Sequence, residues 1–127
     1  MRFRRDLHRV MDNIEFSKQL EKRTRIFAVR IIRRSSTLPN TPEGMVVRNQ
    51  MTKAGTSIGA NYREANRARS RRDFKNKIKI CESAASETQY WLEVVVDLKW
   101  ETWEKVKADY DECSESLAIF TSIGKNT

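Results

Sequence analysis

The spacing of apolar residues along the chain predicts two long amphipathic helices in its first half. From residue 14 onward, side chains suited to a buried face recur at intervals of three and four, which predicts a helix over residues 14–35. A second helix is predicted over residues 42–67, with the alternating four- and three-residue steps of a coiled-coil seam. The first face consists of Phe16, Leu20, Thr24, Phe27 and Ile31, and the second seam of Val47, Met51, Ala54, Ile58, Asn61 and Ala65.

The second half of the chain repeats this pattern over residues 71–97 and 102–123. Further apolar residues at positions 90, 91, 94 and 96 make the C-terminal half of the third helix apolar around much of its circumference. Because one face is enough to fill a monomer core, we expect the rest to meet another subunit. The third seam is Phe74, Ile78, Cys81, Ala85, Thr88, Leu92 and Val95, and the fourth is Trp103, Val106, Tyr110, Cys113, Leu117, Phe120 and Ile123.

Capping residues mark the ends of these helices. Thr41 is a suitable N-cap, and Pro42 follows at the first helical position, where a missing N–H is harmless. Ser70 and Asp73 have the form of a capping box, and Gly124 is a suitable C-cap. Four amphipathic helices with short connections predict an all-α fold, an antiparallel up-down-up-down four-helix bundle over residues 14–125.

Small residues dominate the second helix between Gly55 and Ala60. Two glycines inside a helix each cost about 1 kcal/mol relative to alanine, and we expect tight packing against a neighbouring helix to compensate. Asn61 is polar on an apolar seam, so we expect its side chain to bond to neighbouring backbone or side chains.

The first thirteen residues form a basic segment with Arg2, Arg4, Arg5 and Arg9, for which a flexible arm and a helical extension are both open. This segment lacks the apolar core of a signal peptide. No apolar run in the chain approaches the roughly 18 to 20 residues that span a bilayer. We therefore expect a cytoplasmic protein without a membrane partner.

The charge of the chain favours a polyanionic ligand. The formal net charge is +8, and the sequence is 39% hydrophobic and 33% charged. Residues 1–79 hold 21 Lys and Arg against 7 Asp and Glu, whereas residues 80–127 hold 4 against 10. Part of this asymmetry is expected to be neutralised between packed helices or subunits, and the excess is available to nucleic acid.

Catalytic, metal-binding and cofactor-binding sites are not expected. The one histidine, His8, lies in the N-terminal segment. The chain therefore lacks the histidines needed to activate a nucleophile or to form an ordinary zinc site. The acidic residues of the last two helices are dispersed. Cys81 and Cys113 have no metal-ligand spacing and are interpreted as buried thiols in a reducing compartment.

The joint between the second and third helices is the leading candidate site. Phosphate contacts need cations on an exposed, fixed surface. The aromatic residues fall mainly on apolar periods, so contacts are expected with the nucleic-acid backbone rather than with stacked bases. A solvated face that pairs with the acidic second half is the alternative interpretation. The candidates are Arg63, Arg67, Arg69, Arg71, Arg72, Lys75 and Lys79, with Lys77 beside them and with Arg30, Arg33 and Arg34 on the first helix.

Several motifs occur in order and resemble the four-helix-bundle protein family that is also named after the intervening sequences of bacterial 23S ribosomal RNA genes. These are the SIGAN element at Ser57–Asn61, REA at Arg63–Ala65, the SxxDF cap at Ser70–Phe74 and ETxYWLE at Glu87–Glu93. The resemblance covers roughly residues 14–125. It implies a ring-like homopentamer with no established enzymatic activity.

The relatives of that family include the accessory variability determinant of diversity-generating retroelements, a basic pentamer that binds nucleic acid and a reverse transcriptase. This chain differs from many relatives in the arginines between Ala65 and Phe74, which favours a non-catalytic adaptor or scaffold that binds RNA or DNA. The resemblance implies the chain itself and a reverse transcriptase as further partners. The alternative is a structural or protein-interaction oligomer associated with a 23S rRNA intervening sequence and without direct nucleic-acid binding.

Overall fold

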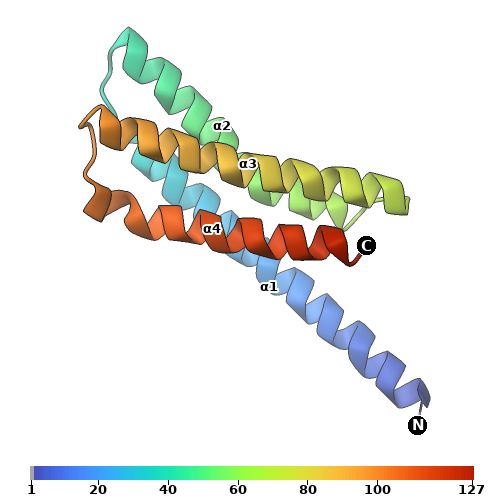
Figure 1. Ribbon diagram of the computed structural model, residues 1–127. Helices are drawn as coiled ribbons and strands as arrows, with labels where there is room; N and C mark the ends of the chain where they lie inside the picture. The colour runs from blue at the N-terminus through green and yellow to red at the C-terminus, as the bar shows by residue number, and fades with distance from the viewer. Residues whose placement is uncertain (1) are drawn as a thin grey trace.

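The computed structural model of the protein describes the backbone of residues 2–127 and the side chains from Leu7 onward. Four helices make up this part of the chain, and it contains no strand. Successive helices run antiparallel, joined by short connections, as expected for a four-helix bundle (Figure 1). The helices are α1 (Arg2–Ser36), α2 (Pro42–Ala65), α3 (Arg71–Asp97) and α4 (Trp103–Lys125).

Side-chain caps begin three of the helices. The Thr41 hydroxyl accepts a hydrogen bond from the Gly44 N–H at the start of α2, and the Ser70 hydroxyl accepts one from the Asp73 N–H at the start of α3, both at 3.0 Å. Thr102 caps α4 in the same way. These hydroxyls satisfy N–H groups that have no partner inside the helix.

The prediction that Gly124 ends the last helix is wrong. Helix α4 continues to Lys125, and the Asn126 N–H donates to the Ser122 carbonyl at 3.2 Å. Gly124 does not adopt the left-handed conformation of a C-cap glycine. It instead lies inside the helix, near Glu82 and Ile78 of α3.

Helix α1 is much longer than the periodic part of its sequence predicted. It starts at Arg2 rather than near residue 14, and its N-terminal part projects beyond the other three helices (Figure 1). The basic N-terminal segment is therefore a helical extension, although the side chains of residues 1–6 lie outside the described part. Phe16, predicted to be on the buried face, is 48% exposed, because at this point α1 has passed the end of the bundle.

The core confirms most of the predicted seams. Leu20, Phe27 and Ile31 of α1 are buried together with most seam residues of the other helices, whereas Trp103 is 43% exposed. The rings of Tyr62 and Phe120 pack with their centroids 5.4 Å apart, which joins α2 to α4 across the core. Asn61 donates to the Ser57 carbonyl at 2.8 Å, which confirms its expected structural role.

Helices α1 and α4 meet less closely than the other neighbouring pairs, and ion pairs span the space between them. Arg23 of α1 pairs with Glu112 of α4 through its Nε atom at 2.6 Å. Further along, the Nε atom of Arg34 lies 2.8 Å from Asp109, and Arg30 pairs with the same carboxylate. Basic residues of the first half of the chain are therefore partly neutralised by acidic residues of the second half.

Candidate nucleic-acid interface

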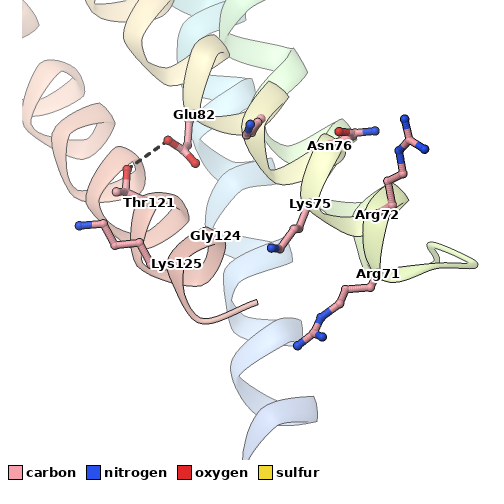
Figure 2. A pocket seen from close by; sticks show the side chains of 9 residues that line it. Arg71, Arg72, Lys75, Asn76, Glu82, Thr121, Gly124 and Lys125 are labelled. Atoms are coloured by element: carbon pink, nitrogen blue, oxygen red, sulfur yellow. Dashed lines mark hydrogen bonds between the residues drawn. The ribbon is translucent and has the colours of Figure 1, made fainter.

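The first turns of α3 and the last turn of α4 form a groove at one end of the bundle. Because Ser70 caps α3, the helix begins at Arg71, and steps of four place Lys75 and Lys79 on the same side. Helix α4 runs antiparallel and ends opposite these residues. The groove has a volume of about 650 Å³. Its lining consists of Arg71, Arg72, Lys75, Asn76, Lys79 and Glu82 from α3, and Thr121, Gly124 and Lys125 from α4 (Figure 2).

This basic groove carries an excess of positive charge. Among the described side chains that line it, Glu82 is the only acidic one, against five cations. All five cations are exposed, and within the described side chains none of them belongs to an ion pair. In Figure 2 the Lys75 side chain is directed toward α4, whereas that of Arg72 is directed away from it. Several phosphates could therefore be contacted in and beside the groove without first breaking a salt bridge.

Glu82 and Gly124 shape the inner part of the groove. The Thr121 hydroxyl donates to the Glu82 carboxylate at 3.3 Å, which ties α4 to α3 (Figure 2). A β-carbon on Gly124 would lie 3.4 Å from the Glu82 Oε1 atom, an ordinary contact distance. The carboxylate makes the Glu82 end of the groove less favourable for an anion than the end formed by the start of α3 and the C-terminus of α4.

Four predicted residues, Arg71, Arg72, Lys75 and Lys79, come together in this groove. Arg67 and Arg69 lie exposed in the connection between α2 and α3, just before the first of them. Arg63 does not join the group, because it lines a separate cavity of about 330 Å³ between α1 and α2, beside Arg25.

Lys77 forms an ion pair within the subunit. Its ammonium group lies 2.8 Å from the Glu64 carboxylate of α2. The hydrogen bond and the attraction between the two charges raise the pKa of Lys77 and lower the pKa of Glu64. This pair fastens the start of α3 to the end of α2.

The three predicted site residues of α1, Arg30, Arg33 and Arg34, lie away from the basic groove, beside the start of α4. Arg30 and Arg34 share the buried Asp109 carboxylate, and Arg34 also lies 3.3 Å from Glu101. Their charge is thus balanced within the subunit. Arg33 is exposed and lines a surface depression with these residues. We leave all three out of the candidate interface.

Lys125 is the cation of the groove that the sequence analysis missed. It is 46 positions from Lys79, so no local cluster of charge points to it. The predicted antiparallel topology was the available signal, because it places the end of the fourth helix beside the start of the third.

Comparison with known proteins identifies the fold. The 23S rRNA-intervening sequence proteins match residues 17–122, which is most of the chain. The chain belongs to this family. A protein of unknown function from the S23 ribosomal protein family of Bacteroides thetaiotaomicron, solved by crystallography, is 38% identical with a TM-score of 0.77. The similarity covers 83% of this chain and 97% of that one. A comparison with curated proteins gave no significant match.

The match to the 23S rRNA-intervening sequence proteins begins at residue 17, so the projecting part of α1 precedes it. The basic groove falls largely within the match, except for its α4 end at Gly124 and Lys125. Within the described residues, no helix is long and apolar enough to cross a membrane. The same part of the chain contains no group of three or more His, Cys, Asp or Glu side chains that could hold a metal ion.

Proposed function

We propose that the protein is a non-catalytic adaptor that binds the phosphate backbone of RNA or DNA through the basic groove. The observation that carries this proposal is the set of five exposed cations, converging from two helices and free of ion pairs in the described side chains. If these cations served only the solubility of the protein, they would not need to line a common groove from separate helices. The exposed Arg67 and Arg69 extend the positive surface along the adjoining connection.

Binding through this groove would be largely independent of base sequence. Among the described side chains, no aromatic residue lines it. Tyr62 is buried in the core, and Trp103 packs against Tyr110 at the start of α4, where α3 ends rather than begins. Base stacking on aromatic rings, which is common in single-strand binding, has no surface here. Lysine and arginine contacts to phosphate position a nucleic acid without reading its sequence.

We further propose that the protein acts as a homo-oligomer, a ring-like pentamer by its resemblance to relatives of the family. The exposed apolar residues Ile80, Tyr90 and Leu98 on α3 support self-association, because apolar side chains gathered on one helix favour an interface. A ring would place several basic grooves on one assembly and would raise the affinity for a long polyanion. An accessory role beside a reverse transcriptase is the most specific form of this proposal.

The test is a gel shift with short RNA and DNA duplexes and single strands of mixed sequence, at salt concentrations from low to physiological. We expect binding at low salt to all four ligands, with an affinity that falls steeply as salt rises. Failure to bind any of them at low salt would refute the proposal and leave a structural or protein-interaction oligomer. A strong preference for one base sequence would contradict backbone recognition.

A further inference from the structure

Helix α1 carries two apolar seams that point in different directions. Leu20, Phe27 and Ile31 form the seam that is buried in the bundle. Leu7, Val10 and Ile14 form another, with steps of three and four, and each is about half exposed. A seam that continued in steps of four and three would return to the same face after seven residues, but Leu20 follows Ile14 by only six. At about 100° per residue, the outer seam is rotated by about 100° from the inner one, so it is not a continuation of the subunit's own core.

Helix α3 also carries a second seam. Beside its buried face, the positions 80, 84, 87, 91, 94 and 98 repeat the steps of four and three. Ile80 and Leu98 are exposed, Trp91 and Val94 are half-buried, and the exposed Tyr90 ring packs edge-on against Trp91. This α3 outer face is therefore mainly apolar and partly accessible, with Ala84 buried and Glu87 as its charged member.

The two outer seams match in spacing. Alternating steps of four and three allow the side chains of one helix to fit between those of another. At a rise of about 1.5 Å per residue, the α1 outer seam from Leu7 to Ile14 is about 10 Å long and the α3 outer seam from Ile80 to Leu98 is about 27 Å long, so the first can lie along part of the second.

Their charges are complementary as well. Residues 2–14 contain four arginines and two aspartates. Residues 80–98 contain four acidic residues and no lysine or arginine. A basic helix and an acidic helix attract and discriminate against pairing with themselves.

The α1 projection cannot reach the α3 outer face of its own subunit. The projection leaves the bundle at the end where α3 begins, and the C-terminal half of α3 lies toward the opposite end (Figure 1). A contact between these two surfaces must therefore join different copies of the chain.

We propose that the α1 projection of one subunit packs on the α3 outer face of a second copy of this chain. This inference rests on the proposed self-association and specifies its contact. Because the two surfaces differ, the contact can repeat head-to-tail, which closes a ring or extends a filament, or can form twice in a reciprocal two-fold dimer. The proposed ring requires the head-to-tail form. The projection precedes the part of the chain that matches the family, whereas the α3 outer face lies within that part.

Two double variants test the contact by sedimentation velocity. Leu7→Glu with Ile14→Glu removes the projecting seam, and Glu87→Lys with Leu98→Glu removes the α3 outer face. We expect each variant alone to be monomeric, and an equimolar mixture to form a heterodimer that grows no further. The mixture retains one intact projection and one intact α3 face, which is enough for a single head-to-tail contact.

Ile26→Glu is the matched control. Ile26 is 50% exposed, as is Leu7, but it lies outside the outer seam, so the variant should keep the wild-type size. Circular dichroism should show unchanged helical content in all variants, because the substituted side chains are exposed. If the α3 double variant unfolds, Glu87→Lys alone replaces it and should raise the dissociation constant of the assembly at least tenfold.

The outcomes separate this inference from the proposals it rests on. A monomeric wild-type protein would refute both the self-association and this contact. A wild-type oligomer whose size survives both double variants would refute only this contact. Dimers of either variant alone, or a mixture without heterodimers, would show that the pairing is not head-to-tail. The basic groove lies within one subunit, so the test of nucleic-acid binding does not depend on this contact.

Discussion

Gly55 of α2 and Ile31 of α1 touch so closely that a side chain on the glycine has no space. A β-carbon at Gly55 would lie 2.6 Å from the Ile31 Cγ2 atom and 2.9 Å from its Cβ atom. Carbon atoms that are not bonded prefer separations of about 3.5 to 4.0 Å. One turn away, a β-carbon at Gly59 would lie 2.9 Å from the Thr24 hydroxyl oxygen. The two glycines therefore set the distance between α1 and α2.

Replacing Gly55 by alanine should destabilise the protein. Helix propensity alone would make alanine better by about 1 kcal/mol, but overpacking a core costs about 1 to 3 kcal/mol, and Ile31 is buried and stiff at χ1. We expect a lower Tm by circular dichroism. Ala60→Gly, at an exposed position of the same helix, measures how much the difference in helix propensity alone changes the Tm. A Tm for Gly55→Ala at or above that of the wild type would contradict the close approach of the helices.

Asp109→Asn should loosen the contact between α1 and α4. Asp109 is only 2% exposed and receives both Arg30 and Arg34, and hydrogen bonds to charged groups contribute about 1.5 to 3 kcal/mol. The control is Asp111→Asn, which removes an exposed pair with Lys107 and should cost about 0 to 1 kcal/mol. Urea unfolding measures both. Equal losses in the two variants would show that the buried carboxylate has no special role.

Glu112 should make stability depend on acidic pH. Its hydrogen bonds from Arg23 lower the pKa of its carboxyl group below the ordinary 4.5. A lowered folded-state pKa stabilises the protein above the unfolded-state pKa, and this stabilisation is lost as the pH falls through the folded-state value. The Tm difference between wild type and Glu112→Gln should thus be present at pH 7 and shrink below about pH 4.5. A difference that is constant from pH 7 to pH 2 would contradict this linkage.

The charge of the basic groove should determine the salt dependence of nucleic-acid binding. Replacing Arg71, Lys75 and Lys79 together by glutamine should reduce the slope of log Kd against log salt by up to about 2.7, at about 0.9 per phosphate contact. The same change at Lys53, Lys99 and Lys105, which are exposed elsewhere, removes equal charge and should reduce it much less. Equal effects would indicate a diffuse electrostatic attraction instead of a site.

Lys125→Gln should weaken binding about as much as Lys75→Gln, because the two lysines line the same groove from different helices. Arg63→Gln should weaken it less, since Arg63 faces the separate cavity between α1 and α2. Fluorescence anisotropy with a labelled duplex at fixed low salt measures all three. A larger loss for Arg63 than for Lys125 would move the interface to the other side of α2.

Both cysteine thiols should be unreactive in the folded protein. Cys81 and Cys113 are buried, and desolvation raises the pKa of each to about 12. The thiolate, which is the reactive form, is therefore scarce at neutral pH. We expect no reaction with a thiol-specific disulfide reagent in native buffer and two equivalents after unfolding. Rapid labelling of the native protein would contradict the packing of α3 against α4.

The sequence by itself determined the four helices, two of their N-caps and most of the core seams. These features depend on short-range rules: apolar residues three and four positions apart share a helix face, and a hydroxyl at an N-cap reaches an N–H three residues later. The roles of Gly55, Gly59 and Asn61 were predictable for the same reason, because glycines inside a helix and a polar residue on a seam each require a local explanation.

Only the tertiary structure decided which charges are free and which apolar residues are exposed. Arg34 and Asp109 are 75 positions apart in sequence and form a pair, whereas Lys125 joins a groove begun at Arg71. Phe16 follows the period of a buried face yet lies beyond the bundle's end. Periodicity indicates which face of a helix is apolar, but the helix packed across from that face determines whether a residue is covered, paired or left for a partner.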